Sequence, residues 1–240
     1  MVIARPARRW LVAGAMLLAA CGGGDGEAEP IGPTIPPDPE VIVAASAAAM
    51  GEVESVRFEV ERTGAPVYID SFESIALNTI VGEFSVPHSA RALLEVEVDG
   101  SLTTELGAVA IDDDIWLSNP VTGEFEPLPA GFDLDPSRFF DPQDGWRPLL
   151  ADLEDVELVG IEDRDGTRYH VRGTASAEQV EVITAGLVRD QAVVADFWIQ
   201  PVTGLVHAAE FTTTFRGGSI DWSLELSEFG EPFEITPPVG

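Results

Sequence analysis

Many segments of the chain alternate apolar and polar residues, which is the period of a β-strand that buries one face. The clearest examples are residues 56–60, 94–98 and 219–226. Asp99 and Gly100 supply the chemistry of a tight hairpin turn. Further strands are predicted at residues 102–111, 115–117, 156–163, 167–174, 193–199 and 205–215. This succession of strands and turns predicts a large antiparallel sheet with one apolar face.

Helical patterns interrupt the strands at a few places. Asp38 and Pro39 supply an N-cap and a first position for a helix that continues through residues 41–50. Ser176 and Gln179 form a capping box at the start of another helix. The apolar positions on one helical face are Trp146, Leu149, Leu150 and Leu153 in the middle of the chain, and Val180, Ile183 and Leu187 after the capping box. Amphipathic helices of this kind are expected to cover the apolar face of the sheet.

The first residues have the features of an export signal. Basic residues precede an apolar stretch over residues 10–20, which is too short for a membrane span of about 20 apolar residues. Residues 18–21 read Leu-Ala-Ala-Cys, and Cys21 is the only cysteine of the chain. This matches the lipobox of bacterial lipoproteins, in which the thiol is acylated and the chain is cut before it. We predict a lipoprotein signal peptide over residues 1–20 and lipidation at Cys21; the alternative is an ordinary signal peptide with a chance cysteine.

The segment that follows Cys21 has the composition of a flexible linker. Ten of the eighteen residues from 22 to 39 are Gly or Pro, and no apolar periodicity is present. Such a segment cannot bury a core. We therefore predict a tether over residues 21–38 and one folded domain over residues 39–240.

The chain is strongly acidic, with 13 Lys and Arg against 42 Asp and Glu and a formal net charge of −29. Loss of residues 1–20 removes three arginines and no acid, so the mature charge is 10 − 42 = −32. A surface with this charge repels nucleic acid and anionic lipid headgroups. Membrane attachment is therefore expected through acyl chains on Cys21, and no nucleic-acid partner is expected.

The sequence offers no set of residues for catalysis, a metal or a cofactor. The histidines are His88, His170 and His207; none lies in an HExxH motif, and the latter two fall in predicted strands, where a structural role is favoured. GxSxG and phosphate-loop motifs are missing from the sequence. Residues 112–114 are three aspartates, but they lack the spacing of a calcium loop and are predicted to form a turn. An enzymatic function is not expected.

Apolar side chains gather instead in the middle of the chain, which has 12 Phe and 5 Trp in all. Phe139, Phe140, Trp146, Leu149 and Leu150 lie among Gly- and Pro-rich turns, and Asp135 and Pro136 open a short helical turn before them. Residues of this kind fill a core, and they also line the pockets that bind small apolar ligands. The composition leaves both interpretations open.

Several motifs together resemble one family. Residues 132–153 contain Phe-Asp-Leu-Asp-Pro-Ser-Arg-Phe-Phe followed by Gly-Trp-Arg-Pro-Leu-Leu, and residues 198–204 contain Trp-Ile-Gln-Pro-Val-Thr-Gly. Residues 114–123 and 165–174 fit two further hairpins. With the lipobox, these motifs resemble the LppX/LprA/LprF/LprG family of bacterial cell-envelope lipoproteins. The resemblance implies an α+β fold: a curved antiparallel half-barrel, with helices across its concave face around an apolar cavity.

The resemblance also implies a function, because members of the family bind multiply acylated lipids, including triacylated glycolipids and triacylglycerol, and help to move them across the envelope. The family supplies no catalytic residue. From the apolar pattern we expect the cavity to be lined by Phe139, Phe140, Trp146, Leu149, Leu150, Val180, Ile183 and Leu187.

The expected protein is thus a carrier of an acylated lipid or glycolipid, exported and anchored through Cys21 to the outer face of the cytoplasmic membrane, with an envelope lipid transporter as a possible partner. The alternative is a surface-anchored, non-catalytic interaction protein, or a transporter partner, with a filled core.

Overall fold

The structure, a computed structural model, describes residues 37–132 and 134–238. The chain divides into two units, Met1–Pro36 and Pro37–Gly240, and the description that follows concerns the second. The predicted signal peptide and Cys21 lie outside the described residues, and so does the predicted tether up to residue 36.

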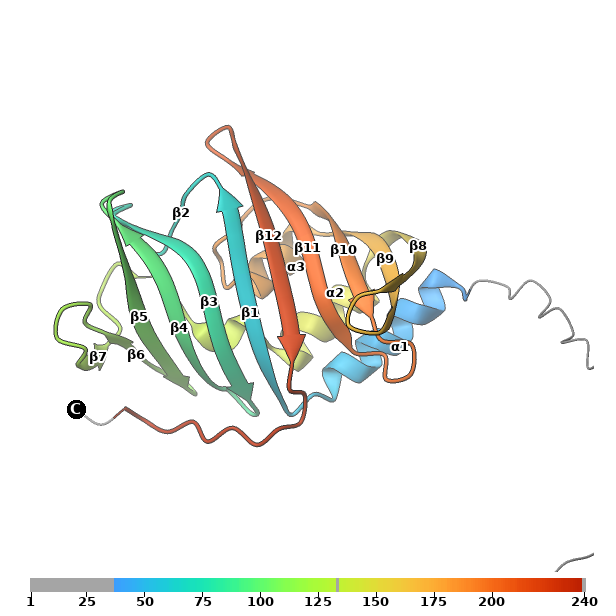
Figure 1. The fold of residues 1–240 in the computed structure, drawn as a ribbon, viewed down its shortest axis with the longest axis horizontal. Coiled ribbons are helices and arrows are strands. Elements are labelled where there is room, and N and C mark those ends of the chain that lie inside the picture. Colours follow the sequence, from blue (N-terminus) through green and yellow to red (C-terminus); the bar gives the residue numbers. More distant parts are fainter. Residues whose placement is uncertain (1–36, 133, 239–240) are drawn as a thin grey trace, which may run out of the picture. The chain divides into compact units, whose positions relative to one another are not determined.

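One antiparallel sheet of twelve strands dominates the described residues (Figure 1). The spatial order is β7-β6-β5-β4-β3-β1-β12-β11-β10-β9-β8, and β2 pairs with β3 beside this path. The strands are β1 (Ser55–Gly64), β2 (Val67–Tyr68), β3 (Ile75–Ser85), β4 (Ser89–Val98), β5 (Leu102–Ile111), β6 (Asp114–Ser118), β7 (Phe125–Pro127), β8 (Glu154–Asp163), β9 (Thr167–Ala175), β10 (Val193–Ile199), β11 (Val206–Phe215) and β12 (Gly218–Ser227).

The sheet consists of two runs of hairpins joined at its centre. Strands β3 to β7 form one run, strands β8 to β12 form the other, and β1 lies between β3 and β12. The register pairs Phe58 of β1 with Leu226 of β12 on one side and with Gly82 of β3 on the other. The first long strand and the last strand of the chain are therefore central neighbours.

The helices lie behind the sheet in Figure 1, across one of its faces. They are α1 (Pro39–Gly51), the 3₁₀ turn η1 (Pro136–Phe139), the π-helical turn η2 (Pro142–Trp146), α2 (Arg147–Ala151) and α3 (Ala177–Ile183). Asp38 accepts a hydrogen bond from the backbone N–H of Glu40, and Ser176 and Gln179 form both bonds of the predicted capping box. An open, curved antiparallel sheet with helices across its concave face confirms the predicted fold class.

Two predicted helices are shorter than the apolar pattern suggested. The middle helix begins with a π-helical turn at Pro142, where the Asp141 side chain caps the N–H groups of Gln143 and Asp144, and α2 ends at Ala151, so that Leu153 lies outside it. The last helix ends at Ile183 because the next turn leaves the helical conformation.

The end of α3 shows why Leu187 is not helical. Ala185 and Gly186 both have positive φ angles, 51° and 80°. The N–H of Gly186 bonds back to the carbonyl of Glu181, which is the longer bond of a Schellman motif, with Ala185 in the left-handed position that glycine usually takes. The chain therefore turns away before Leu187, which lies in the segment that leads to β10.

Candidate functional site

The eight side chains predicted to line a cavity belong to the core between the helices and the sheet or pack against it. Six of them are almost completely buried: Phe139, Phe140, Trp146, Leu149, Leu150 and Val180, with exposed fractions of 0–2%. Ile183 and Leu187 are half-buried and pack against the same core. The structure thus brings all eight residues to the inner side of the sheet.

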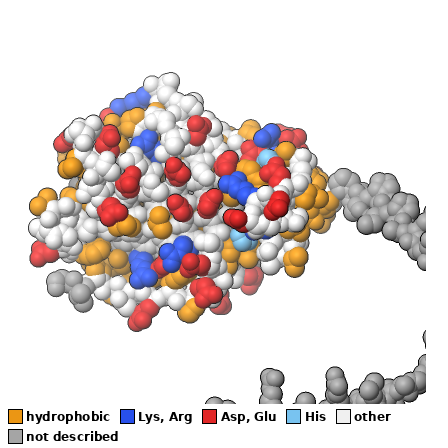
Figure 2. Space-filling view, in the orientation of Figure 1, with side chains coloured by type: hydrophobic (Ala, Val, Ile, Leu, Met, Phe, Trp, Pro, Cys, Tyr) orange, Lys and Arg blue, Asp and Glu red, His pale blue; other side chains and the backbone are white. Residues whose placement is uncertain are grey.

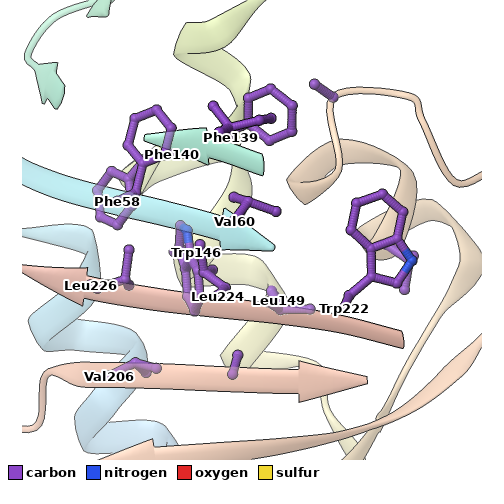
Figure 3. Close-up of a cluster of buried hydrophobic side chains, with 14 of the residues drawn as sticks. Phe58, Val60, Phe139, Phe140, Trp146, Leu149, Val206, Trp222, Leu224 and Leu226 are labelled. Carbon is purple, nitrogen blue, oxygen red and sulfur yellow. The ribbon is translucent and has the colours of Figure 1, made fainter. Parts of the chain in front are cut away.

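Aromatic rings from the helical segments pack against aromatic rings of the sheet (Figure 3). The centroids of Phe139 and Phe58 are 6.3 Å apart, those of Phe140 and Phe84 are 5.5 Å apart, and those of Phe140 and Trp146 are 5.9 Å apart. These spacings are those of favourable ring pairs. In this part of the interior the apolar side chains fill the space between the layers.

Empty space remains in another part of the interior, on the strands β11 and β12 near the hairpin that joins them. An apolar cavity of about 20 Å³ lies between α3 and the sheet. Its lining includes Phe139 and Ile183 from the predicted set, together with the strand residues Val60, Phe211 and Trp222. The sequence pattern contained a signal for one of these strand residues, since Trp222 lies on the apolar face of the clearest alternating strand.

A larger cavity, of about 530 Å³, opens at the rim of the sheet beyond the small one. Its apolar lining includes Val67, Ile69, Leu187 and Ile220. Its polar lining comes from Tyr68, Asp70, Glu73, Arg189, Asp190 and Gln191. Its volume falls within the range of about 300–1,000 Å³ that is usual for pockets that bind small molecules.

The two cavities follow one another along the inner face of β11 and β12. Thr213 pairs with Ile220 and lines the larger cavity, whereas Phe211 pairs with Trp222 and lines the smaller one. The Phe211 and Trp222 rings are stacked with centroids 5.9 Å apart, and the indole Nε1 of Trp222 donates to the hydroxyl of Thr213 at 2.9 Å. This aromatic pair therefore lies next to the boundary between the rim cavity and the apolar interior.

Two polar atoms of the interior have no hydrogen-bond partner among the described residues, the indole Nε1 of Trp146 and the hydroxyl of Ser46. Both side chains are completely buried. An unpaired buried donor costs about 1–3 kcal/mol. A ligand oxygen that reached either atom would therefore accept a hydrogen bond without any bond inside the protein having to break first.

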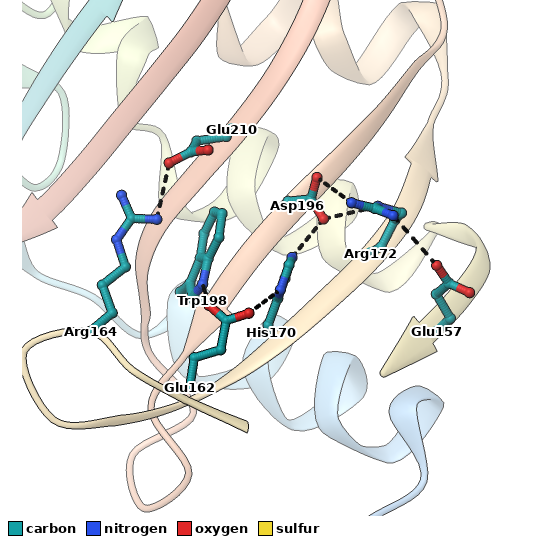
Figure 4. Close-up of polar contacts among 8 residues, drawn as sticks. All are labelled: Glu157, Glu162, Arg164, His170, Arg172, Asp196, Trp198 and Glu210. Atoms are coloured by element: carbon teal, nitrogen blue, oxygen red, sulfur yellow. Dashed lines mark hydrogen bonds and ion pairs between the residues drawn. The ribbon is translucent and has the colours of Figure 1, made fainter. Parts of the chain in front are cut away.

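A polar cluster occupies the other face of the sheet, on β8, β9 and β10 (Figure 4). The two ring nitrogens of His170 lie 2.7 Å from a carboxylate oxygen of Glu162 and 2.6 Å from one of Asp196. Asp196 also accepts two bonds from Arg172, and Glu162 accepts one from Trp198. The bonds from Trp198 and His170 lower the pKa of Glu162. These contacts join neighbouring strands, and the cluster contains no Ser, Thr or Cys nucleophile.

Two aspartate features noted in the sequence lie at a turn and at a helix cap. Asp112 and Asp113 form the turn between β5 and β6, and the side chain of Asp135 caps η1. Within residues 37–132 and 134–238, no group of three or more His, Cys, Asp or Glu is arranged to hold a metal ion. In the same residues, no helix combines the length and the apolar character needed to cross a membrane.

Comparison with known structures finds the same fold in two mycobacterial proteins. The structure resembles LprF from Mycobacterium bovis with a TM-score of 0.61 and 15% identity, covering 84% of this chain and 97% of LprF. It resembles LppX from Mycobacterium tuberculosis with a TM-score of 0.56 and 20% identity, covering 82% of this chain and 97% of LppX. No curated protein matches the chain.

An open, curved sheet with helices across its concave face is the fold of these lipoproteins, whose family is one of lipid-binding proteins. The sequence profile of the LppX_LprAFG lipoproteins matches residues 38–235, nearly the whole described unit. The chain belongs to this family, and the resemblance seen in the sequence motifs is confirmed. Lipoproteins of this kind are exported and membrane-anchored.

Proposed function

We propose that the protein is a membrane-anchored carrier that binds multiply acylated lipids or glycolipids between its helices and its sheet and moves them across the cell envelope. The observation that carries the proposal is the succession of cavities along β11 and β12, from the open rim to the apolar interior. The acyl chains would enter at the rim and extend beneath the helices. The polar headgroup would remain beside Tyr68, Glu73 and Gln191 at the mouth.

The driving force for this binding is the removal of acyl chains from water. Each buried methylene contributes about 0.8 kcal/mol, so two or three long chains provide more than enough free energy for tight binding. The same unfavourable contact of acyl chains with water makes the free lipid nearly insoluble in the aqueous space outside a membrane. A carrier removes the acyl chains from water in its apolar interior, and its acidic exterior keeps the complex in solution.

The interior must expand to receive such a ligand, because the cavity next to Phe211 and Trp222 measures only about 20 Å³. Two features favour expansion on the helical side. Helix α3 has only seven residues, and it is followed by Ala185 and Gly186 in the left-handed conformation. We infer that lipid entry displaces the Phe211–Trp222 pair and moves α3 away from the sheet.

The remaining parts of the proposal concern the N-terminal region. Acyl chains on Cys21 would hold the protein at the outer face of the cytoplasmic membrane, and the Gly- and Pro-rich segment to residue 38 would let the folded unit move away from that surface. An envelope lipid transporter would supply or receive the cargo. No catalytic step is part of this function.

A second candidate function has one observation in its favour. Five of the predicted cavity residues, Phe140, Trp146, Leu149, Leu150 and Val180, are buried in the core and line neither the rim cavity nor the small cavity. A core filled in this way also suits a surface-anchored interaction protein that carries no lipid.

Native mass spectrometry of the full-length protein purified from its own host distinguishes the two functions. A carrier retains one or more acylated lipids, and after delipidation it takes up tripalmitoylglycerol from mixed micelles. Ile183→Trp, which fills the small cavity, should abolish uptake while the protein remains folded. Val121→Trp is the matched control, since Val121 is 90% exposed. A protein that carries no lipid from its host and takes none up would support the filled-core alternative.

A further inference from the structure

A third cavity lies on the outer face of the sheet, away from the proposed lipid site. The β8–β9 hairpin bends over this face, so that Arg164 near its tip contacts Glu210 of β11 and Glu225 of β12. The cavity under the hairpin has a volume of about 280 Å³, and its basic lining consists of Arg57, Arg164, Arg168 and His207. Figure 2 shows that acidic side chains are spread over this face of the molecule, with basic ones between them.

Arg168 is the unusual member of this lining, because only 6% of its surface is exposed and none of the carboxylates in residues 37–132 and 134–238 forms an ion pair with it. Its two terminal nitrogens donate to backbone carbonyls, Nη1 to Thr167 at 3.0 Å and Nη2 to Asp165 at 2.9 Å. Its third donor, Nε, is buried and has no partner among the described residues. A buried guanidinium normally has an anionic partner, since the charge is costly to remove from water.

His207 offers a second buried atom of the same kind. Its Nε2 has no hydrogen-bond partner among the described residues. Burial lowers the pKa of His207, the positive charge of Arg168 lowers it further, and a hydrogen bond to the backbone of Leu226 acts in the opposite direction. Arg168 and His207 line the same cavity, so one ligand bound there would lie beside both side chains.

The other two arginines of the cavity already form ion pairs, although Nε of Arg57, like Nε of Arg168, has no hydrogen-bond partner among the described residues. Arg57 pairs with Glu83 at 2.8 Å and with Glu228 at 3.1 Å. Arg164 pairs with Glu210 at 3.0 Å, and its guanidinium carbon lies 4.2 Å from the centre of the Trp198 ring.

The acidic lining of the cavity consists of Glu59, Asp165 and Glu225. Glu225 is the second carboxylate paired with Arg164. Asp165 contacts Arg168 only through its backbone carbonyl. Among the described residues no carboxylate forms an ion pair with Arg168, although the carboxylates of Glu59 and Asp165 line the same cavity.

We propose that this cavity binds a small oxyanion of the phosphate type, in which one oxygen accepts a hydrogen bond from Nε of Arg168 and a P–OH group donates one to Nε2 of the neutral His207. Hydrogen bonds between charged groups are the strongest in proteins, and apolar walls such as Val81 and Ala208 strengthen them by excluding water. The cavity is too small for an acyl chain and its headgroup together. A phosphate from solution and the phosphate of a lipid headgroup share the chemistry that this site recognises.

The site is separate from the proposed carrier function, because its residues belong to the face of the sheet opposite the helices. Outer-face positions on β9 include Arg168, His170 and Arg172, whereas Val171 between them faces the core. Loss of oxyanion binding would therefore leave the inner cavities unchanged, and a filled interior would leave the oxyanion site unchanged.

Isothermal titration calorimetry of the full-length protein in detergent tests the proposal, with inorganic phosphate as the first probe and dihexanoyl phosphatidic acid as the second. All titrations use one ionic strength, because the acidic surface opposes anion binding to an extent that depends on salt. We expect millimolar or tighter binding of at least one probe. Binding of both probes identifies phosphate itself as sufficient. Binding of the lipid alone identifies a headgroup site only if Arg168→Gln weakens it, because the inner cavities could also take up the acyl chains; unchanged lipid binding in that variant contradicts the proposal.

Arg168→Gln should weaken this binding by about tenfold or more, since it removes the charge and keeps a similar size. Arg91→Gln is the matched control: Arg91 is an exposed outer-face arginine paired with Glu83 and does not line the cavity. If Arg168→Gln fails to fold, His207→Gln tests the same contact from β11. The proposal is overturned if neither probe binds, or if the folded variant at either position binds phosphate as tightly as the unmutated protein does.

Discussion

Leu150 provides the sharpest test of how the helices pack on the sheet. It lies in α2, it is completely buried, and it belongs to the same core as Phe140 and Trp146. Neither the rim cavity nor the small cavity reaches it. The larger side chain of a Leu150→Trp variant therefore has no empty space to occupy in the ligand-free protein.

The expected cost follows from this packing. Extra bulk in a filled core typically destabilises a protein by about 1–3 kcal/mol. For a domain of about 200 residues, each kcal/mol lowers the melting temperature by about 2–4 °C, so the expected decrease is roughly 2–12 °C. Leu102→Trp is the control, because Leu102 is 60% exposed and such substitutions change stability by about 0.5 kcal/mol or less.

Differential scanning calorimetry gives the melting temperature, and urea unfolding gives the free energy of unfolding. The same samples, delipidated and then incubated with tripalmitoylglycerol, report how much lipid each variant takes up. We expect Leu150→Trp to melt below the control and to take up less lipid. If the two variants melt alike, α2 is not packed on the sheet as described; if their lipid uptake is equal, the face of α2 is not part of the lipid site.

Three further predictions concern other parts of the chain. Cys21→Ala should leave a protein that is uncut or released, and its retention in the membrane fraction with normal processing would contradict lipidation at this position. Ser176→Ala removes the capping box of α3 and should lower the free energy of unfolding by about 1 kcal/mol, measured by urea unfolding. Because the pKa of His207 is lowered from 6.5, the folded state binds this proton less readily than the unfolded chain, and stability should fall as the pH decreases below 6.5. His207→Gln should remove that part of the decrease, and an unchanged pH profile in phosphate-free buffer would show that the imidazole is not responsible.

Local chemistry was sufficient to predict most of the elements. The alternation over residues 219–226 corresponds to β12, and the caps at Asp38 and Ser176 mark the starts of α1 and α3. Strand β3 was not predicted, because it is buried on both faces over much of its length and its register shifts next to Asn78, so that its sequence does not alternate. The early end of α3 depends on Ala185, a residue that rarely adopts a positive φ angle.

The candidate site was predicted only from its helical side. Periodicity identifies which face of a helix is apolar and selected Ile183, whereas Phe139 was selected from the apolar cluster that follows Pro136; both line the small cavity. The strand residues opposite them, Phe211 and Trp222, become neighbours of these helices only through tertiary packing. The size of a cavity also depends on how well the layers fit, and no sequence pattern contains that information.

The central position of β1 in the sheet has a consequence for the order in which the domain folds. Phe58 and its partner Leu226 are separated by 168 residues along the chain, yet their strands lie side by side in the middle of the sheet. The hairpins on either side can form locally, whereas the strand pair that joins them requires both ends of the sequence and the closure of a very long loop. During synthesis, therefore, β1 has no final partner on one edge until β12 has emerged.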